Sequence, residues 1–354
     1  MAETAGGTKG QVQHPILHPI LHGGDLDAAR AAFPQAPEPW VDLSTGINPW
    51  PYPVPAILDS AWTRLPGRGE EEALRVAAAA CYGAPSSAHA AAAPGSQALI
   101  QWLPRLRRPG KVSVLGPTYA EHARAWAASG HAVRTVGRME DLEGDVAVIV
   151  NPNNPDGRIV GRADLLALAG RFAGRGGWLV VDEAFADVVP EASVSDAVDR
   201  PGLIVLRSFG KFFGLAGVRL GVALAAEPLA TRIRDAVGPW AVPGPTLAVA
   251  TRALQDDSWI AEARRRLVDA AASFDLRLGS LGLSVVGGTP LYRLVRHRHA
   301  TQIVNALGRA GLLARRFEEH PEWLRFGLPA DDAGQQRLVH AMENMVDKSN
   351  SLGC

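Results

Sequence analysis

Between residues 55 and 225 the sequence alternates between short apolar runs and stretches with helical periodicity. The apolar runs are KVSVL (111–115), HAVRTV (131–136), DVAVIV (145–150), GWLVVD (177–182), GLIVLRS (202–208) and VRLGVAL (218–224). The helix-like stretches lie near 55–64, 70–82, 96–106, 119–129 and 162–173. Strands that are apolar along their whole length belong in parallel sheets that helices cover on both faces. The pattern therefore predicts an α/β fold with a mostly parallel sheet sandwiched by helices.

The rest of the chain predicts a smaller domain and an N-terminal arm. At about 150 residues per domain, 354 residues favour two domains. After about residue 229 helix dominates, with a long charged stretch near 257–280 and short strand candidates at 283–288, 291–296 and 323–328. These elements are typical of an α+β domain. We expect an arm over 1–45, of which 1–13 is disordered, a large domain over 46–238 and a small C-terminal domain over 239–354.

Composition excludes several classes of protein. Lys plus Arg and Asp plus Glu both number 36, so the chain lacks the basic excess of a nucleic-acid binder. No apolar run approaches the roughly 18 residues that span a bilayer, and the N-terminus lacks the layout of a signal peptide. The two cysteines are too few for a disulfide framework. We expect a cytoplasmic protein without nucleic-acid or membrane partners.

A short tandem repeat, HPILHPILHGG, places histidines at positions 14, 18 and 22. On a helix this spacing would align them as metal ligands. Pro15 and Pro19 disfavour a regular helix, so the repeat favours an extended arm over a metal site. No metal is predicted.

Polar residues follow four of the predicted strands. They are Gly116–Tyr119, Asn151–Gly157, Asp182–Glu183 and Ser208–Lys211. Ligands of open α/β sheets bind outside the carboxyl ends of the strands. The sequence therefore predicts one pocket at this edge of the sheet.

Lys211 is the strongest candidate for a nucleophile. The chain has only four lysines, at 9, 111, 211 and 348, and Lys211 alone lies among aromatic and small apolar residues, in SFGKFFGLAGV. A lysine in such surroundings has a lowered pKa and attacks carbonyls well. The alternative is an ordinary solvated surface charge.

Two further features have both a structural and a functional interpretation. Asp182 closes an apolar strand, so it is either a cap or ion-pair partner, or the counter-ion of a protonated ring nitrogen such as that of pyridoxal phosphate (PLP). Gly95, Ser96 and Gln97 begin a helix, so they form a plain N-cap or a phosphate site. A dinucleotide fold is disfavoured because no G-x-G-x-x-G follows a strand. A P-loop would need Gly where Val205 stands and Ser or Thr where Phe212 stands.

Taken together, these motifs resemble fold-type I PLP enzymes of the aspartate aminotransferase superfamily. NPNNPDG resembles the family's N-P-x-N-P-[TD]-G, VDEAF its D-E-A-[YF], and SFGKFFGLAGVRLG its S-x-x-K-x-x-G-x-x-G-x-R-x-G. The chain looks most like the branch that holds histidinol-phosphate aminotransferases and threonine-phosphate decarboxylases. HGGD (22–25), DLSTGINPWPYP (42–53) and GLLARRFEEHPEWLRFGLP (311–329) look like the decarboxylases.

The resemblance implies PLP as cofactor and a role for each matching residue. Lys211 would bind the cofactor covalently, Asp182 would hold the proton on its ring nitrogen, Asn154 would donate to its phenolic oxygen, and Tyr119 would stack on its ring. Gly95, Ser96, Gln97, Ser208 and Arg219 would hold its phosphate. Arg325 would bind the substrate carboxylate. His22, Gly23, Asn48 and Arg315, with Asn154, are the further candidates for contacts with the substrate.

Two positions depart from the family pattern. Phe185 stands where many relatives have a Tyr that helps to hold the phenolic oxygen, which leaves more of that task to Asn154. Arg64-Leu65-Pro66 stands where aminotransferases often show R-Y-P, whose Tyr reaches the partner subunit's cofactor phosphate.

The resemblance implies decarboxylation of L-threonine O-3-phosphate to (R)-1-amino-2-propanol O-2-phosphate in cobalamin biosynthesis, by a homodimer. The alternatives are an aminotransferase for histidinol phosphate or a similar amino acid, and a non-catalytic binding module that keeps the PLP fold. The need for a 2-oxo acid separates the first two.

Overall fold

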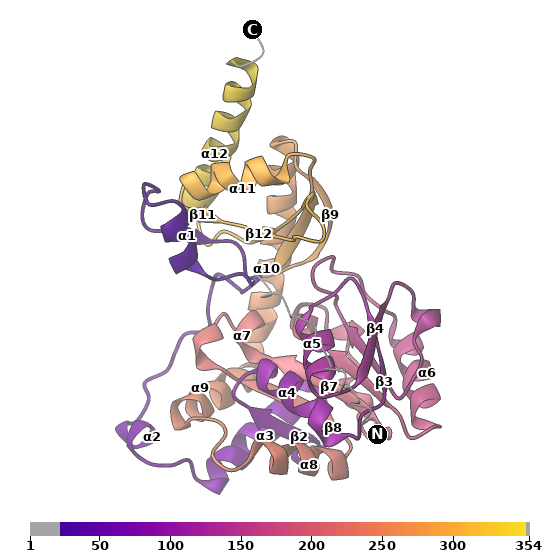
Figure 1. Ribbon diagram of the computed structural model, residues 1–354. Coiled ribbons are helices and arrows are strands. Elements are labelled where there is room, and N and C mark those ends of the chain that lie inside the picture. The colour runs from indigo at the N-terminus through magenta and orange to yellow at the C-terminus, as the bar shows by residue number, and fades with distance from the viewer. Residues whose placement is uncertain (1–21, 352–354) are drawn as a thin grey trace, which may run out of the picture.

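The computed structural model describes residues 22–351, with side chains up to residue 343. The expectations for 1–13 and for His14 and His18 lie outside these residues. The described chain forms a larger unit around a seven-stranded sheet and a smaller unit around a four-stranded sheet. Helix α10 (Asp257–Ser280) connects the two units (Figure 1).

The large sheet confirms the predicted mostly parallel architecture. Its order is β2–β8–β7–β6–β5–β3–β4, and β8 runs antiparallel to both neighbours while the other recorded pairings are parallel. The strands are β2 (Ala90–Ala93), β3 (Lys111–Leu115), β4 (Ala132–Val136), β5 (Val146–Val150), β6 (Trp178–Asp182), β7 (Leu203–Ser208) and β8 (Gly221–Ala225). Because Val150 pairs with Asp182 and Asp182 with Leu206, the carboxyl ends of three strands lie level.

Both faces of the sheet are covered by helices, because consecutive apolar residues of a strand point to opposite sides. Val146 and Val148 pack with α4 (Ser96–Trp102), α5 (Glu121–Ala128) and α8 (Glu227–Val237). Ala147 and Ile149 belong to a second cluster, with α3 (Arg68–Tyr82), α6 (Arg162–Ala173) and α9 (Gly244–Leu254). Helices thus cover both faces of the sheet, which leaves the carboxyl ends of its strands as the place where a ligand can bind.

The smaller unit is an antiparallel sheet of order β12–β13–β10–β9. Its strands are β9 (Ser284–Thr289), β10 (Tyr292–Arg296), β12 (Arg315–Arg316) and β13 (Trp323–Gly327), and its helices are α11 (Ala300–Arg309) and α12 (Asp332–Ser351). In the register of β12 and β13, Arg315 lies opposite Arg325. This pairing places two arginines side by side on one short ladder.

The N-terminal arm packs on the smaller unit. Strand β1 (Val41–Asp42) pairs in parallel with β11 (Leu312–Leu313), and α1 (Leu26–Ala32) lies beside β11 in Figure 1. Phe33, which follows α1, packs so closely on Gly308 of α11 that a Cβ there would lie 2.3 Å from the ring. The arm and the smaller unit are therefore one packed body.

Helix α9 belongs to the segment expected to form the small domain, after the boundary at residues 238/239. It lies beyond that point in the chain, yet it packs on α3 and on α2 (Asp59–Thr63) of the larger unit. In this structure the chain passes from one unit to the other within α10, which contacts β9 and β10.

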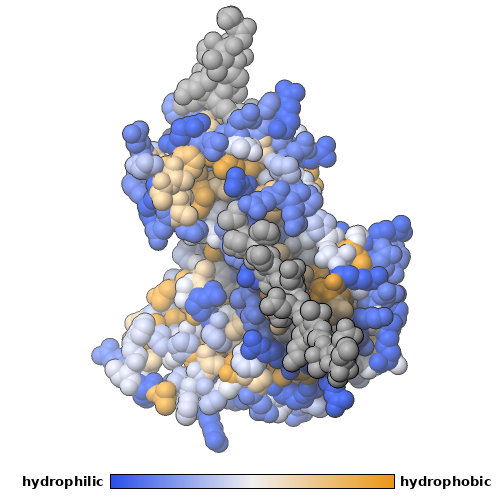
Figure 2. All heavy atoms as spheres, in the orientation of Figure 1, coloured by the Kyte–Doolittle hydropathy of each residue, from blue (hydrophilic) through white to orange (hydrophobic). Residues whose placement is uncertain are grey.

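The surface shown in Figure 2 is mostly hydrophilic, with apolar residues in small separate areas. No helix in the part of the chain that the structure describes is long and apolar enough to cross a membrane. Nor do the described residues contain a group of three or more His, Cys, Asp or Glu side chains that could hold a metal ion.

Candidate active site

A cavity of about 1000 Å³ opens at the carboxyl ends of the large sheet's strands. Its walls come from the loops after β3, β5 and β7, from the start of α4 and α5, and from the arm and β12–β13. The predicted site residues that line it are His22, Gly23, Gly95, Ser96, Gln97, Tyr119, Asn154, Asp182, Ser208, Lys211, Arg219, Arg315 and Arg325. The structure thus brings together residues that are up to 303 positions apart, from His22 to Arg325.

Asn48 is the one predicted site residue that does not line the cavity. It is buried, its side-chain NH2 donates to Phe212 O at 2.9 Å, and its Oδ1 accepts from Trp50 N at 2.9 Å. Its own N–H donates to Lys211 O at 2.9 Å. Both ends of the amide are therefore engaged by backbone, and Asn48 anchors the 48–52 loop to the segment that carries Lys211 instead of facing a substrate.

Lys211 lies in α7 (Phe209–Phe212), the short helix that follows β7. Its pKa is lowered to about 8, first because burial disfavours the ammonium form and then because Arg325 and Arg219 add positive charge nearby. Its Nζ lies 5.9 Å from the centre of the Phe185 ring. A lysine with this pKa has a substantial neutral fraction near pH 8, so it can attack an aldehyde.

Asp182 ends β6 and is 3% exposed. Its Oδ2 lies 2.7 Å from Nε2 of His122, a residue of α5, and its Oδ1 accepts from Ala184 N at 3.1 Å. His122 is 1% exposed, so the pair is closed off from solvent. The partner of Asp182 is therefore a histidine and not one of the many arginines, and the carboxylate still lines the cavity.

The start of α4 forms a cradle in which two glycines are required. Gly95 has φ +90°, and a Cβ on it would lie 2.8 Å from Arg219 Nη2. A Cβ on Gly221 would lie 2.2 Å from Ser96 N. Gly95 thus leaves room for the guanidinium of Arg219 and Gly221 for the backbone N–H of Ser96, and both donors line the cavity with Ser208. Such a set of donors suits a phosphate.

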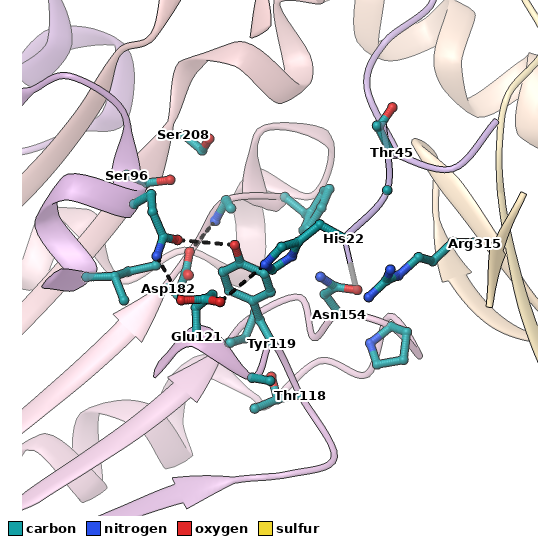
Figure 3. Close-up of a pocket in the computed structure, with 18 of the residues that line it drawn as sticks. His22, Thr45, Ser96, Thr118, Tyr119, Glu121, Asn154, Asp182, Ser208 and Arg315 are labelled. Atoms are coloured by element: carbon teal, nitrogen blue, oxygen red, sulfur yellow. Dashed lines mark hydrogen bonds and ion pairs between the residues drawn. The ribbon is translucent and has the colours of Figure 1, made fainter. Parts of the chain in front are cut away.

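Two arginines from the smaller unit reach into the same cavity. Arg325 is 5% exposed, its Nη1 donates to Asn154 Oδ1 at 2.6 Å, and its Nη2 donates to Ser44 O at 2.6 Å. Its Nε has no partner among the described atoms, and burial lowers its pKa to about 10. Burial also lowers the pKa of Arg315, whose side chain extends toward Asn154 in Figure 3. No ion pair recorded in the described residues joins either arginine to a carboxylate.

Tyr119 faces the cavity from the loop before α5. Its hydroxyl donates to Gln97 Oε1 at 3.1 Å. Its pKa is raised to about 12 by burial, and the charges of Glu121 and Asp182 act in the same direction. The hydroxyl therefore stays protonated near neutral pH and acts as a hydrogen-bond donor.

The residues that line the cavity match PLP group by group. An amine with a lowered pKa corresponds to the aldehyde of that cofactor, and a glycine cradle with an arginine corresponds to its phosphate. A buried carboxylate corresponds to the ring nitrogen, an amide to the phenolic oxygen, and an aromatic ring to the ring face. They are, in that order, Lys211, Gly95 to Gln97 with Arg219, Asp182, Asn154 and Tyr119. The residues present therefore fit the cofactor.

Sequence reasoning missed two polar residues of this site, Glu121 and His122. Both are buried at the start of α5, and each contacts a predicted site residue. Their segment, AEHARAWAA, looks like an ordinary amphipathic helix. Glu121 lines the cavity, whereas His122 contacts Asp182 without lining it, and only their position two and three residues after Tyr119 could have suggested their place in the site.

Comparison with known proteins agrees with the geometry. The sequence model of the family described as aminotransferase class I and II matches residues 54–342. The chain is 47% identical over 325 residues to a threonine-phosphate decarboxylase of Pseudomonas aeruginosa, which covers 91% of this chain and 96% of that protein. It is 44% identical over 328 residues to a threonine-phosphate decarboxylase of Sinorhizobium sp., which covers 92% and 98%.

A solved structure confirms the fold. Histidinol-phosphate aminotransferase from Sinorhizobium meliloti, in complex with pyridoxal-5'-phosphate, superposes with a TM-score of 0.77 at 18% identity. The superposition covers 97% of this chain and all of that one. From the match of the family model over most of its length and from the two relatives above 40% identity, the chain belongs to the aminotransferase class I and II family.

Proposed function

We propose that the protein is a PLP-dependent carbon–carbon lyase that decarboxylates L-threonine O-3-phosphate to (R)-1-amino-2-propanol O-2-phosphate and carbon dioxide, in cobalamin biosynthesis. The observation that carries the proposal is the pair Arg315 and Arg325. They lie opposite each other on β12 and β13, line the same cavity as Lys211 and have no recorded carboxylate partner in the described chain. Two unpaired cations beside a reactive lysine suit a small amino acid with two anionic ends. The two decarboxylase relatives support the same substrate.

The two arginines differ in what surrounds them, and this suggests which anion each one holds. Arg325 is fixed by Asn154 and Ser44, so its guanidinium has one orientation and suits the planar carboxylate next to the reacting carbon. Arg315 is only partly buried and lines the cavity together with His22 from the arm. These two residues would hold the phosphate.

Bound PLP supplies a ring that accepts the electrons of the breaking bond at the substrate's α-carbon. Lys211 would hold the cofactor through its amine, and the same amine would deliver a proton to the α-carbon. Asp182, fixed by His122, would hold the proton on the ring nitrogen. Asn154, whose Oδ1 accepts from Arg325, would donate its NH2 to the cofactor's phenolic oxygen. The chain thus supplies the nucleophile, the acid and the counter-ion.

Which bond breaks depends on how the substrate is held. Electrons pass into the ring only from a bond that stands perpendicular to it. A grip on the phosphate by Arg315 and His22 would turn the carboxylate bond into that orientation. Because Arg325 stabilises the carboxylate before it leaves, decarboxylation needs stabilisation elsewhere that appears only in the transition state. The counter-ion pair of Asp182 and His122 is the part of the site that can provide it.

Exposed apolar residues support a homodimer. Val54, Leu58, Trp62 and Leu65 are 57%, 77%, 67% and 64% exposed and belong to one segment around α2. A patch of this kind is typical of a surface that another protein covers. The segment includes Leu65, at the position where related aminotransferases often carry the tyrosine that reaches the partner subunit. We propose that a second copy covers it, and that the enzyme works in the cytoplasm.

The test of the proposed function is carbon dioxide release from L-threonine O-3-phosphate by purified protein with PLP and no 2-oxo acid. We expect release, and we expect Lys211→Ala to abolish it together with the absorbance of lysine-bound cofactor. Lys111→Ala, at the exposed start of β3, is the matched control and should change neither. A requirement for 2-oxoglutarate would instead identify an aminotransferase.

A further inference from the structure

Glu121 is a buried carboxylate in a cavity that otherwise gathers positive charge. It is the first residue of α5, is 7% exposed, and lines the cavity with Lys211 and four arginines. An acid in the first turn of a helix interacts favourably with the helix dipole. That effect does not require the side chain to turn inward. Burial of a carboxylate is unfavourable unless hydrogen bonds compensate for the loss of water. The hydrogen-bond partners of Glu121 therefore explain why this side chain can be buried in the cavity.

The two oxygens of Glu121 bind side chains from two different parts of the chain. His22 Nε2 lies 3.2 Å from Oε1, and Gln97 Nε2 donates to Oε2 at 3.2 Å (Figure 3). Arg124 Nη1 lies 3.8 Å from Oε1. The carboxylate therefore connects the N-terminal arm, through His22, to the cofactor cradle, through Gln97.

The bond to Gln97 also fixes Tyr119. Because the NH2 of Gln97 donates to Glu121, its Oε1 points the other way and accepts from the Tyr119 hydroxyl at 3.1 Å. An amide that meets a carboxylate on one side and a hydroxyl on the other has only this orientation. Glu121 thus determines, through one side chain, how the aromatic ring is held over the cofactor position.

The bond to His22 fixes the arm at the opening of the cavity. The arm is held a second time where Gly24 N donates to Ser44 Oγ at 2.7 Å, and Ser44 Oγ in turn donates to Asp42. The His22 side chain itself is 46% exposed, and its recorded contacts are the hydrogen bond to Glu121 and the ring of Tyr119, whose centre lies 6.0 Å away. His22 lines the cavity, and among the described residues no hydrogen bond is recorded for its second ring nitrogen.

We propose that Glu121 is a positioning residue that sets the preference for a phosphorylated substrate, by holding His22 at the phosphate end of the cavity and Tyr119, through Gln97, at the cofactor end. The proposal rests on the proposed function, because it takes the substrate phosphate as the ligand of His22. A glutamine at this position carries no charge and could accept only through its one oxygen. With that oxygen kept toward the NH2 of Gln97, its own NH2 would meet His22 Nε2, so the charge-assisted bond to His22 is lost and the ring keeps the contact only as the neutral tautomer that accepts at Nε2.

The test compares the PLP-loaded wild type with Glu121→Gln, with His22→Ala and with the double variant. Each is titrated with L-threonine O-3-phosphate and with L-threonine, and binding is followed by the cofactor absorbance. We expect Glu121→Gln to raise the Kd for the phosphorylated ligand about tenfold, the loss of one charge-assisted hydrogen bond, with a much smaller change for L-threonine. In the His22→Ala background the same substitution should add little.

Equal losses for both ligands, or losses that simply add in the double variant, would overturn the proposal. A wild type that does not prefer the phosphorylated ligand would instead contradict the proposed function, so the two failures differ. Glu262→Gln is the matched control, because Glu262 is an exposed residue of α10 that pairs with Arg265. Because His22 is half exposed, His22→Ala tests the same contact without risk to the core.

A second measurement needs neither cofactor nor turnover. Hydrogen exchange of the peptide that contains residues 22–26 is compared between cofactor-free wild type and Glu121→Gln. Faster exchange in the variant, with an unchanged rate in the core strand β6, supports the role of Glu121 in holding the arm. An unchanged rate in residues 22–26 would contradict it.

Discussion

Asp182 and His122 form a 2.7 Å hydrogen bond between two side chains that are 5% and 1% exposed, and Asp182 lines the cavity that contains Lys211. A carboxylate so placed keeps its charge only while a partner and a backbone N–H compensate for the lost water. His122 supplies that partner from α5, and Ala184 N supplies the backbone donor. The orientation of Asp182 toward the cavity therefore depends on a helix that contributes nothing to the β6 strand.

Removal of this partner should lower activity without removing the cofactor. In His122→Phe the Oδ2 of Asp182 loses its bond, which we expect to reduce kcat about tenfold and stability by about 1–3 kcal/mol. Both are measured on one preparation, by turnover and by urea unfolding. His131→Phe is the matched control, since His131 is also buried but bonds to Pro104 O away from the cavity. It should lose stability and keep kcat. Equal kcat values in the two variants would argue against a role for His122 in catalysis.

Arg325→Lys should raise KM for the substrate sharply. A lysine keeps the charge but cannot donate at once to Asn154, to Ser44 and to a carboxylate. We expect KM to rise by roughly 10- to 100-fold, corresponding to about 1.4–3 kcal/mol, while PLP still binds. Arg296→Lys, at an exposed position of the neighbouring strand β10, provides the comparison. Normal kinetics in Arg325→Lys would move the carboxylate contact to another residue.

The lowered pKa of Lys211 predicts how cofactor uptake depends on pH. The attacking form is the neutral amine, and its share increases as pH rises through about 8. The rate at which cofactor-free protein incorporates PLP, followed by absorbance, should therefore rise with pH and level off above that value.

The same pKa predicts the effect of a charge change nearby. Arg325 contributes to the lowering, so in Arg325→Met the pKa of Lys211 should increase and the whole profile should shift to higher pH. Arg296→Met should leave the profile where it is. An identical midpoint in wild type and Arg325→Met would show that the charge of Arg325 does not act on Lys211.

The phosphate cradle is expected to tolerate no added methyl group at Gly221. In Gly221→Ala the new Cβ would lie 2.2 Å from Ser96 N, so the start of α4 must move. Overpacking of this kind costs about 1–3 kcal/mol, which we expect to appear as a roughly 5- to 150-fold loss of PLP affinity in equilibrium titrations. Gly217→Ala, where a Cβ would meet nothing within 4 Å, should bind PLP normally. Tight binding by Gly221→Ala would mean that the cradle is not where the cofactor phosphate lies.

The parts of the fold that follow from hydrophobic patterning could be predicted from the sequence. The run GWLVVD gave β6 within one residue, and the charged stretch near 257–280 is α10. Strand β2 was missed because AAAA carries neither β-branched side chains nor alternation, and only its pairing with β8 makes it a strand. In the large sheet, patterning therefore identified the strands that contain β-branched residues, the partly exposed β4 among them, and missed the buried strand made only of alanines.

The site could be predicted only as far as its residues follow strands. Lys211, Asp182 and Asn154 stand directly after apolar runs, and the structure brings them into one cavity. Glu121 faces that cavity because of the rotation of α5 about its axis, which no local pattern encodes. Asn48 was expected there from its loop, yet its amide is taken up by Phe212 O and Trp50 N. The roles of all these residues toward cofactor and substrate stay predictions for the experiments above.

The parallel pairing of β1 with β11 determines which residues can move together. Val41 and Asp42 are bonded to Leu312 and Leu313, so Ser44 and Thr45 travel with Arg315 and Arg325 in any rotation of the smaller unit about α10. The residues expected to bind the two anionic ends of the substrate would then belong to the smaller unit, and Lys211 and Asp182 to the larger one. Arg325 Nη1 donates to Asn154 Oδ1 in the loop after β5, so one hydrogen bond already joins the two groups of residues between which the reacting carbon would be held.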